Sequence, residues 1–291
     1  MAASMTDLSI AINRQMLAAK ISQAIDDYCV KTYSEPFRKH LGASVIGDEC
    51  SRKLYYMFRW FKAVQKSPRE YRLFNRGNLE ELRFVDYLRG IGMQVWVKDD
   101  NNRQFVISDI GNHFGGSTDG VSRLPDTYNI LEPLLCEFKT KGTGSGFDKL
   151  KKNGIKVEAH QHFVQMSVYG FKLNIKYGLY MVANKNDDEL YIEIVELDHR
   201  LALSSIGKAA EIINAKQIPT RISENAATIE CRMCDFSGIC HRNERASINC
   251  RSCKFSVPLD AAEWGCNLNG RIEVINKQLI PVGCQQYEAI K

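Results

Sequence analysis

The sequence predicts a fold of the α/β or α+β class, closed at its C-terminal end by a cysteine-rich region. Three observations support this prediction. Helical periodicity covers the N-terminal part, strand-like runs lie on both sides of a further helix, and seven of the ten cysteines fall between residues 231 and 284. The expected order is helices, strands, a helix, more strands, a last helix and the cysteine-rich tail.

Helices are predicted where apolar residues recur every three or four positions. In the first helix, Leu17, Ile21 and Ile25 show this spacing. Gly90 and Gly92 stop the third helix, and Pro219 ends the last one. The predicted helices cover residues 6–33, 50–62, 77–88, 157–172 and 199–216.

Strands are predicted where β-branched and aromatic residues form short runs between turn residues. An Asn-Asp-Asp sequence joins the last two runs and suits a hairpin. The glycine- and lysine-rich residues 140–156 are expected to form a loop or lid. The predicted strands cover residues 93–99, 103–110, 116–124, 134–140, 177–185 and 189–197.

The composition is typical of a globular protein and shows no membrane span. Of the 291 residues, 44% are hydrophobic and 25% charged, and no run of about eighteen apolar residues occurs. The N-terminal segment lacks the basic-then-apolar order of a signal peptide. We therefore expect a cytoplasmic protein, in a bacterium or a phage-infected cell, with one large domain or one domain and a small appendage.

Positive charge is concentrated between Arg38 and Arg76. This stretch holds ten lysines and arginines against three acidic residues, and aromatic residues are interleaved with them. One interpretation is a nucleic-acid surface, which uses basic groups for phosphates and aromatic rings for stacking. The other is an amphipathic helix with its aromatic residues turned inward.

Two acidic residues and a lysine predict a catalytic site. Glu137 and Lys139 follow an apolar run, and side chains two apart on a strand point to the same face. Asp119 precedes a glycine at the end of an earlier predicted strand. Two carboxylates and the Phe138 carbonyl could bind a magnesium or manganese ion, while Lys139 orients or deprotonates a water or neutralises charge on a phosphate. The simpler alternative is an ion pair at a strand end.

Two further patterns add to this set. Glu81 follows Gly77 by four positions on a predicted helix, from which it could reach the same site. Gln165 and Tyr169 are also four apart, on one face of the helix after the basic loop.

Together these motifs resemble the PD-(D/E)XK nuclease superfamily, in particular its RecB-like exonuclease branch. The matching motifs are G-x-x-x-E from Gly77, G-x-x-D-G from Gly116, E-F-K from Glu137 and H-x-x-Q-x-x-x-Y from His162, over about residues 40–200. The resemblance implies a mixed central sheet flanked by helices, metal binding by Asp119 and Glu137, and assistance to the attacking water by Lys139. It also implies that Gln165 and Tyr169 line the site or contact DNA. Many relatives carry a histidine where Glu81 stands, and the glutamate is more similar to phage recombination exonucleases.

The first group of clustered cysteines predicts a metal site. Cys231, Cys234 and Cys240 need a fourth thiolate to hold a cluster, and Cys50 is the candidate. One early and three late cysteines resemble the [4Fe–4S] staple of CRISPR-associated RecB-like exonucleases and AddB-type nucleases. A zinc ion is the alternative, because zinc accepts the same ligands.

The second group predicts a small zinc ribbon at the end of the chain. Cys250 and Cys253 form a C-x-x-C pair, and Cys266 and Cys284 follow singly. His241 is a possible substitute ligand, whereas Cys29 and Cys136 lie in apolar patterns and are expected to be buried thiols. We thus divide the chain into a nuclease domain, residues 1–240, and a zinc-ribbon-like tail, residues 241–291.

These features predict a magnesium- or manganese-dependent exonuclease that hydrolyses DNA ends in recombination, repair or phage DNA processing. Arg52, Arg76 and Lys141 are the predicted DNA-binding residues. The resemblance to phage exonucleases implies a single-strand annealing protein as a partner. The alternatives are a nucleic-acid-binding module without nuclease activity and a sequence- or structure-specific endonuclease on the same core.

Overall fold

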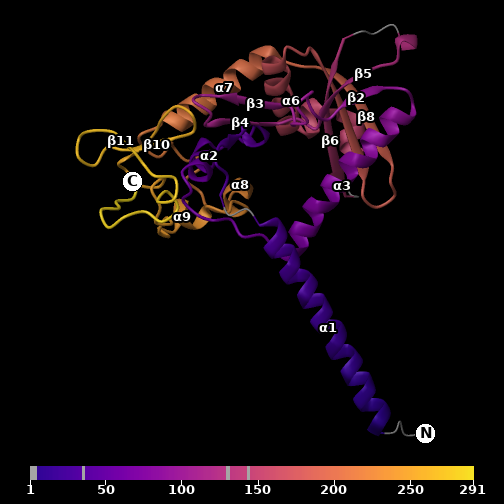
Figure 1. Ribbon diagram of the computed structural model, residues 1–291, viewed down its shortest axis with the longest axis horizontal. Helices are drawn as coiled ribbons and strands as arrows, with labels where there is room; N and C mark the ends of the chain where they lie inside the picture. The colour runs from indigo at the N-terminus through magenta and orange to yellow at the C-terminus, as the bar shows by residue number, and fades with distance from the viewer. Residues whose placement is uncertain (1–4, 35–36, 129–131, 143–144) are drawn as a thin grey trace. The chain divides into compact units, whose positions relative to one another are not determined.

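The computed structural model describes residues 5–34, 37–128, 132–142 and 145–291 (Figure 1). The chain forms two compact units. The smaller unit contains residues Met1–Pro36 and Val64–Leu79, and the larger unit contains Phe37–Ala63 and Glu80–Lys291. The predicted nuclease domain, residues 1–240, therefore includes residues of both units, whereas the cysteine-rich tail lies in the larger unit; the boundary at residue 240 stays a prediction.

The smaller unit consists of helix α1, Met5–Tyr33, and the first part of helix α3, Pro68–Gly90. The prediction of a helix at residues 6–33 is confirmed. Helix α3 begins at Pro68 and not at Gly77, because Ser67 and Glu70 form a capping box: each accepts a hydrogen bond from the other's backbone N–H. Proline also suits the first helical position. No helix within the described ranges is long and apolar enough to cross a membrane.

The central sheet of the larger unit has five strands in the order β2-β5-β6-β7-β8. Strands β6 and β7 are parallel and their other neighbours are antiparallel, so the sheet is mixed. The parallel pair requires a long crossover, which the segment between β6 and β7 supplies. The strands are β2 Gln94–Trp96, β5 Gly120–Arg123, β6 Leu134–Lys141, β7 Tyr177–Asn184 and β8 Leu190–Glu196.

Two smaller sheets have three strands each. One contains β1 Leu41–Gly42, β3 Val106–Asp109 and β4 Phe114–Ser117, and the other contains β9 Ser256–Pro258, β10 Trp264–Cys266 and β11 Glu273–Val274. The prediction of one strand over residues 116–124 is wrong, since β4 and β5 belong to different sheets. The chain turns between them at Gly120, whose φ of +156° favours glycine and whose added Cβ would lie 2.9 Å from the Trp96 carbonyl oxygen.

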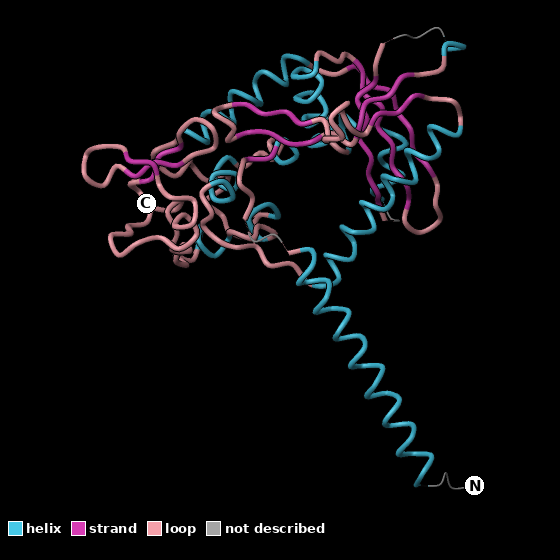
Figure 2. Tube along the Cα trace, viewed as in Figure 1, coloured by secondary structure: helices cyan, strands magenta, loops and turns pink. Residues whose placement is uncertain are grey.

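Helices and long loops make up the rest of the larger unit, as Figure 2 shows. The prediction of a loop over residues 140–156 is wrong, because helix α4 occupies much of it. Phe147 and Leu150, three positions apart, are buried on one face of that helix. The helices are α2 Ser51–Phe58, α4 Ser145–Asn153, α5 Ile155–Glu158, α6 His160–Leu173, α7 His199–Asn214, α8 Ile229–Arg232 and α9 Ser237–His241, with 3-10 turns at Ala43–Val45 and Asp126–Tyr128.

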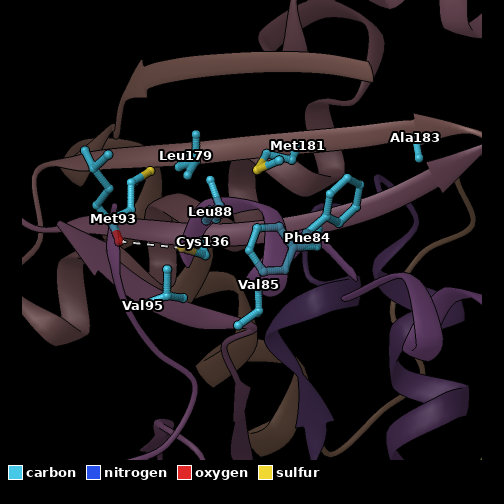
Figure 3. Packing of buried hydrophobic residues seen from close by; sticks show 11 residues of the cluster. Phe84, Val85, Leu88, Met93, Val95, Cys136, Leu179, Met181 and Ala183 are labelled. Carbon is cyan, nitrogen blue, oxygen red and sulfur yellow. Dashed lines mark hydrogen bonds between the residues drawn. The ribbon is translucent and has the colours of Figure 1, made fainter. Parts of the chain in front are cut away.

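The central sheet is covered on both faces. On one face, the part of α3 that belongs to the larger unit packs against β2, β6 and β7, with Phe84 beside Phe138 and Leu88 near Leu179 (Figure 3). On the other face lies α6, which in turn packs against α7. Strand β6 is therefore buried on both sides, and Glu137, which faces α6, has no exposed surface. The cluster comprises Phe84, Val85, Leu88, Met93, Val95, Leu134, Cys136, Phe138, Leu179, Met181 and Ala183.

The aromatic residues of the basic stretch in the larger unit are largely internal. Tyr55, Tyr56, Phe58 and Phe61 are at most 2% exposed. They pack against one another and against the C-terminal segment, as the contact of Phe58 with Trp264 illustrates. The amphipathic-helix interpretation is confirmed for Tyr55, Tyr56 and Phe58, which lie on α2, whereas Phe61 is buried just beyond the helix. Cys29 and Cys136 are buried, as predicted.

Candidate active site

Asp119, Glu137 and Lys139 come together where β5 and β6 meet. Asp119 lies just before β5, and its Oδ2 accepts a hydrogen bond of 2.7 Å from the Phe138 backbone N–H. This bond fixes the carboxylate beside β6. Lys139, two positions after Glu137, points to the same face and forms an ion pair with Glu137 Oε1.

The Lys139 ammonium group is surrounded by the oxygen atoms that we predict to bind a metal ion. Its Nζ donates a hydrogen bond of 3.0 Å to the Phe138 carbonyl oxygen, lies 3.8 Å from Asp119 Oδ2, and contacts Glu137 Oε1. A positive charge therefore already lies among these three groups. Lys139 remains partly accessible, with 29% of its side chain exposed, so the cluster opens to the surface on this side.

Helix α6 supplies the opposite wall of the site. Gln165 donates a hydrogen bond of 2.9 Å to Glu137 Oε2, and both side chains are buried. Tyr169, one turn later, is 2% exposed and lies against the backbone of β4. A Cβ added at Gly116 would lie 2.4 Å from the Tyr169 hydroxyl oxygen, so only glycine allows this approach. The motifs from Gly116 and from His162 thus meet in space.

Glu81 on α3 completes the acidic cluster. Its side chain is half-buried, and burial followed by the negative charge of Asp119 raises the pKa of Glu81 to about 7. The positive charge of Lys139 lowers the pKa of Glu81. Helix α3 therefore places a third carboxylate close enough to interact with Asp119 and Lys139, as the motif from Gly77 predicts.

The buried charges of the site perturb one another strongly. Burial raises the pKa of Glu137 to about 8, although the charge of Lys139 lowers it. Burial lowers the pKa of Lys139, but the charges of Glu137 and Asp119 outweigh this and raise it above its ordinary value. Lys139 therefore carries its proton at neutral pH. Perturbed groups of this kind cluster at functional sites.

A histidine–tyrosine pair adjoins the cluster and was not assigned a role from the sequence. His162 Nδ1 lies 2.7 Å from the hydroxyl of Tyr180, which is paired with Glu137 in the β6–β7 register. Burial and the charges of Lys139 and Lys141 lower the pKa of His162 to about 4, so its ring is neutral. Tyr180 had no sequence signal, because it lies inside an ordinary apolar strand.

The donor set suits a hard divalent cation, since it offers carboxylate and carbonyl oxygens. The side chains are arranged around Lys139, however. In the described part of the chain, no group of three or more His, Cys, Asp or Glu side chains has the arrangement that holds a metal ion. Metal binding here requires the carboxylates to exchange the Lys139 ammonium group for the metal.

The three predicted DNA-binding residues lie in different surroundings. Lys141, at the end of β6, is close enough to the site to shift the pKa of His162. Arg52 donates a hydrogen bond of 2.6 Å to the Pro219 carbonyl and contacts Cys240 Sγ at 3.8 Å, so it lies among the cysteines of the first group. Arg76 belongs to the smaller unit.

The first four cysteines line one cavity of about 460 Å³. Cys50 is at the N-cap of α2, where its sulfur accepts a hydrogen bond of 3.4 Å from the Lys53 N–H. Basic groups surround the cavity: Arg221, which the sequence did not single out, donates two hydrogen bonds to the Cys240 carbonyl. The predicted members Cys50, Cys231, Cys234 and Cys240 all belong to the lining, as does His241.

The second four cysteines line a smaller cavity of about 170 Å³. Burial, followed by the negative charges of Cys284, Cys253 and Cys266, raises the pKa of Cys250 to about 11. The four thiols are therefore close enough to influence one another, although they come from three separate segments of the tail.

Comparisons with known proteins give limited matches. No family model and no curated protein matches the chain. Among solved structures, SSO0001 is similar with a TM-score of 0.43 and 15% identity, over 76% of this chain and 96% of that one. An alkaline exonuclease, LHK-Exo, from Laribacter hongkongensis is similar with a TM-score of 0.42 and 16% identity, and its complex with dAMP gives 0.43 and 16%. Both LHK-Exo matches cover 60% of this chain and 86% of the exonuclease. At this level of similarity we draw no functional conclusion from these matches.

Proposed function

We propose that this chain is a magnesium- or manganese-dependent deoxyribonuclease of the PD-(D/E)XK type that removes nucleotides from DNA ends. The observation that carries the proposal is the position of the Lys139 ammonium group among Asp119, Glu137 and the Phe138 carbonyl. These oxygen groups would hold the divalent cation, and Glu81 would add a further carboxylate. The cation would supply charge for the phosphate and lower the pKa of a bound water.

The protein's own groups have separate roles in this proposal. Lys139, which keeps its proton, neutralises charge that develops on the phosphate. Gln165 holds Glu137 in place through its 2.9 Å hydrogen bond, and Tyr169 fixes α6 against β4. Lys141 contributes positive charge for the DNA backbone at the rim of the site.

The [4Fe–4S] cluster at Cys50, Cys231, Cys234 and Cys240 is a further part of the proposal. Their shared cavity and the nearby Arg52, Arg221 and Lys53 support it, since cationic groups offset the negative charge of a thiolate-bound cluster. The cavity also contains His160 and Gln161, so the cluster would lie beside the first turn of α6 and stabilise the helix that carries Gln165. A role in recombination, repair or phage DNA processing, with a single-strand annealing protein as partner, belongs to the same proposal.

The test compares end-labelled linear DNA with covalently closed circular DNA, with magnesium, manganese or a chelator. We expect the metal-dependent release of nucleotides from linear DNA alone. Glu137→Gln, Asp119→Asn and Lys139→Ala should abolish it, and Glu81→Ala and Gln165→Ala should reduce it less. Glu196→Gln is the matched control, because the Glu196 side chain is 63% exposed and pairs only with Lys176 in the described structure.

Each alternative function has its own result in this experiment. Cleavage of the closed circle would indicate an endonuclease. DNA binding without hydrolysis under either metal would indicate a binding module. Full activity of Glu137→Gln would contradict the proposed mechanism.

A further inference from the structure

The C-terminal segment is attached to the residues just after helix α2 by contacts between distant parts of the sequence. Ser247 donates a backbone hydrogen bond of 2.7 Å to the Phe61 carbonyl, and the Asn249 amide donates one of 2.9 Å to the Trp60 carbonyl. The residues that follow, Arg251 and Ser252, are the two between Cys250 and Cys253. The C-x-x-C turn is therefore one of the parts of the tail that lie on the core, as Ser256 and Trp264 also do.

Arg251 is buried in a cage of aromatic rings. It is 1% exposed, and its guanidinium carbon lies 4.6, 4.3 and 4.5 Å from the ring centres of Phe58, Trp60 and Trp264. Its Nη1 donates hydrogen bonds to the carbonyls of Arg38 and Lys39, whereas Nε and Nη2 have no hydrogen-bond partner. Ring faces attract a cation, but they do not replace a counter-ion.

A second buried arginine lies beside the first. Arg59 is 3% exposed, lies 5.1 Å from the ring centre of Trp264, and donates two hydrogen bonds of 3.1 Å to the Ser256 carbonyl. Within the part of the chain that the structure describes, no carboxylate forms an ion pair with Arg59 or Arg251. Two buried positive charges without counter-ions are costly, so a source of negative charge is needed nearby.

We propose that Cys250, Cys253, Cys266 and Cys284 bind one zinc ion, and that this site is the counter-ion of Arg59 and Arg251. Four thiolates around Zn²⁺ carry a net charge of −2, which matches the two guanidinium groups. Ser256 links the two sites, because it lines the cysteine cavity and its carbonyl accepts both hydrogen bonds from Arg59. Arg251 is joined to the cavity through the backbone of the C-x-x-C turn. In the described part of the chain these four thiols do not have the arrangement that holds a metal ion, so binding requires them to turn toward the centre of the cavity they share.

The ligand set and the available space favour a single ion. Four cysteines, two of them in a C-x-x-C pair, are typical of structural zinc sites. The cavity of about 170 Å³ is much smaller than that of the first cysteine group, about 460 Å³, and a four-iron cluster needs more room than one ion. Zinc binding would thus hold the tail against the end of α2, and this role would be independent of the nuclease chemistry.

The experiment measures zinc and iron in the full chain, purified without added metal. We expect one zinc per chain in the wild type, its loss in Cys250→Ser and in Cys284→Ser with the iron content unchanged, and retention of zinc in Cys29→Ser. The melting temperature of the two zinc-free variants should fall by roughly 5 °C or more. If these variants do not fold, titration of the wild-type chain with a thiol reagent must still release one zinc.

Arg251→Met tests the counter-ion role, with the exposed Arg271→Met as the matched control. We expect zinc to leave Arg251→Met roughly tenfold more readily in competition with a chelator, and to leave Arg271→Met at the wild-type rate. Absence of zinc from the wild type, or its retention in both cysteine variants, would overturn the zinc site. Unchanged zinc affinity in Arg251→Met would overturn the pairing of charges.

Discussion

Replacement of Gly116 by alanine should destabilise the protein through one identifiable contact. The added Cβ would lie 2.4 Å from the Tyr169 hydroxyl oxygen, and the next closest atom, Cζ of the same ring, is 3.3 Å away. Tyr169 is buried and cannot move aside without shifting α6. Overpacking of this kind costs about 1–3 kcal/mol. For a chain of this size the melting temperature should fall by roughly 2–6 °C.

A double variant identifies the cause. Tyr169→Phe removes the hydroxyl oxygen and leaves the 3.3 Å contact, which a small displacement can relieve. Gly116→Ala with Tyr169→Phe should therefore be more stable than Gly116→Ala alone. Gly207→Ala is the control, because its Cβ meets no atom within 4 Å in helix α7 and should stabilise by up to about 1 kcal/mol. Additive losses in the double variant would refute the assigned contact.

Four further predictions concern charge, capping and the cluster. The folded-state pKa of Glu137 is raised to about 8 from 4.5, so the protonated carboxyl stabilises the folded chain and this stabilisation is lost as the pH rises toward 8. Urea unfolding in the presence of a chelator should therefore show a free energy of unfolding that falls between pH 6.5 and 8. Glu137→Gln should flatten this pH dependence. The Asp198 carboxylate is the N-cap of α7 and accepts hydrogen bonds from two backbone N–H groups. Asp198→Ala should therefore lower the free energy of unfolding by about 1 kcal/mol in the same assay. Cys50→Ser should remove iron and its visible absorbance and lower the melting temperature; full iron content would exclude Cys50 as a ligand. Lys141→Ala should weaken DNA binding and reduce the slope of log affinity against log salt by about 1, and an unchanged slope would place its charge away from DNA.

The sequence predicted which residues lie together better than it predicted the boundaries of the elements. Asp119, Glu137, Gln165 and Tyr169 converge as their motifs predict, because strand and helix periodicities determine which side chains share a face. The separation of β4 and β5 into two sheets could not be predicted, since it depends on the distant contact of Gly120 with Trp96.

The start of helix α3 was present in the sequence but was missed. The capping box from Ser67 to Glu70 precedes Gly77, the predicted first helical position. Tyr180 and the caged Arg251 had no comparable signal. Their surroundings come from residues far along the chain, and no local pattern records such contacts.

The contact between α2 and the tail also has a consequence in time. Arg59 and Ser256 are 197 residues apart. The aromatic rings around Arg59 therefore cannot pack against the C-terminal segment until that length of chain has been synthesised. At about 5–20 residues per second, this interval is roughly 10–40 s on the ribosome. During it, Phe58 and Trp60 offer apolar surface to any chaperone or nascent neighbour. The segment around Ser256 thus completes a part of the larger unit that is synthesised 197 residues earlier.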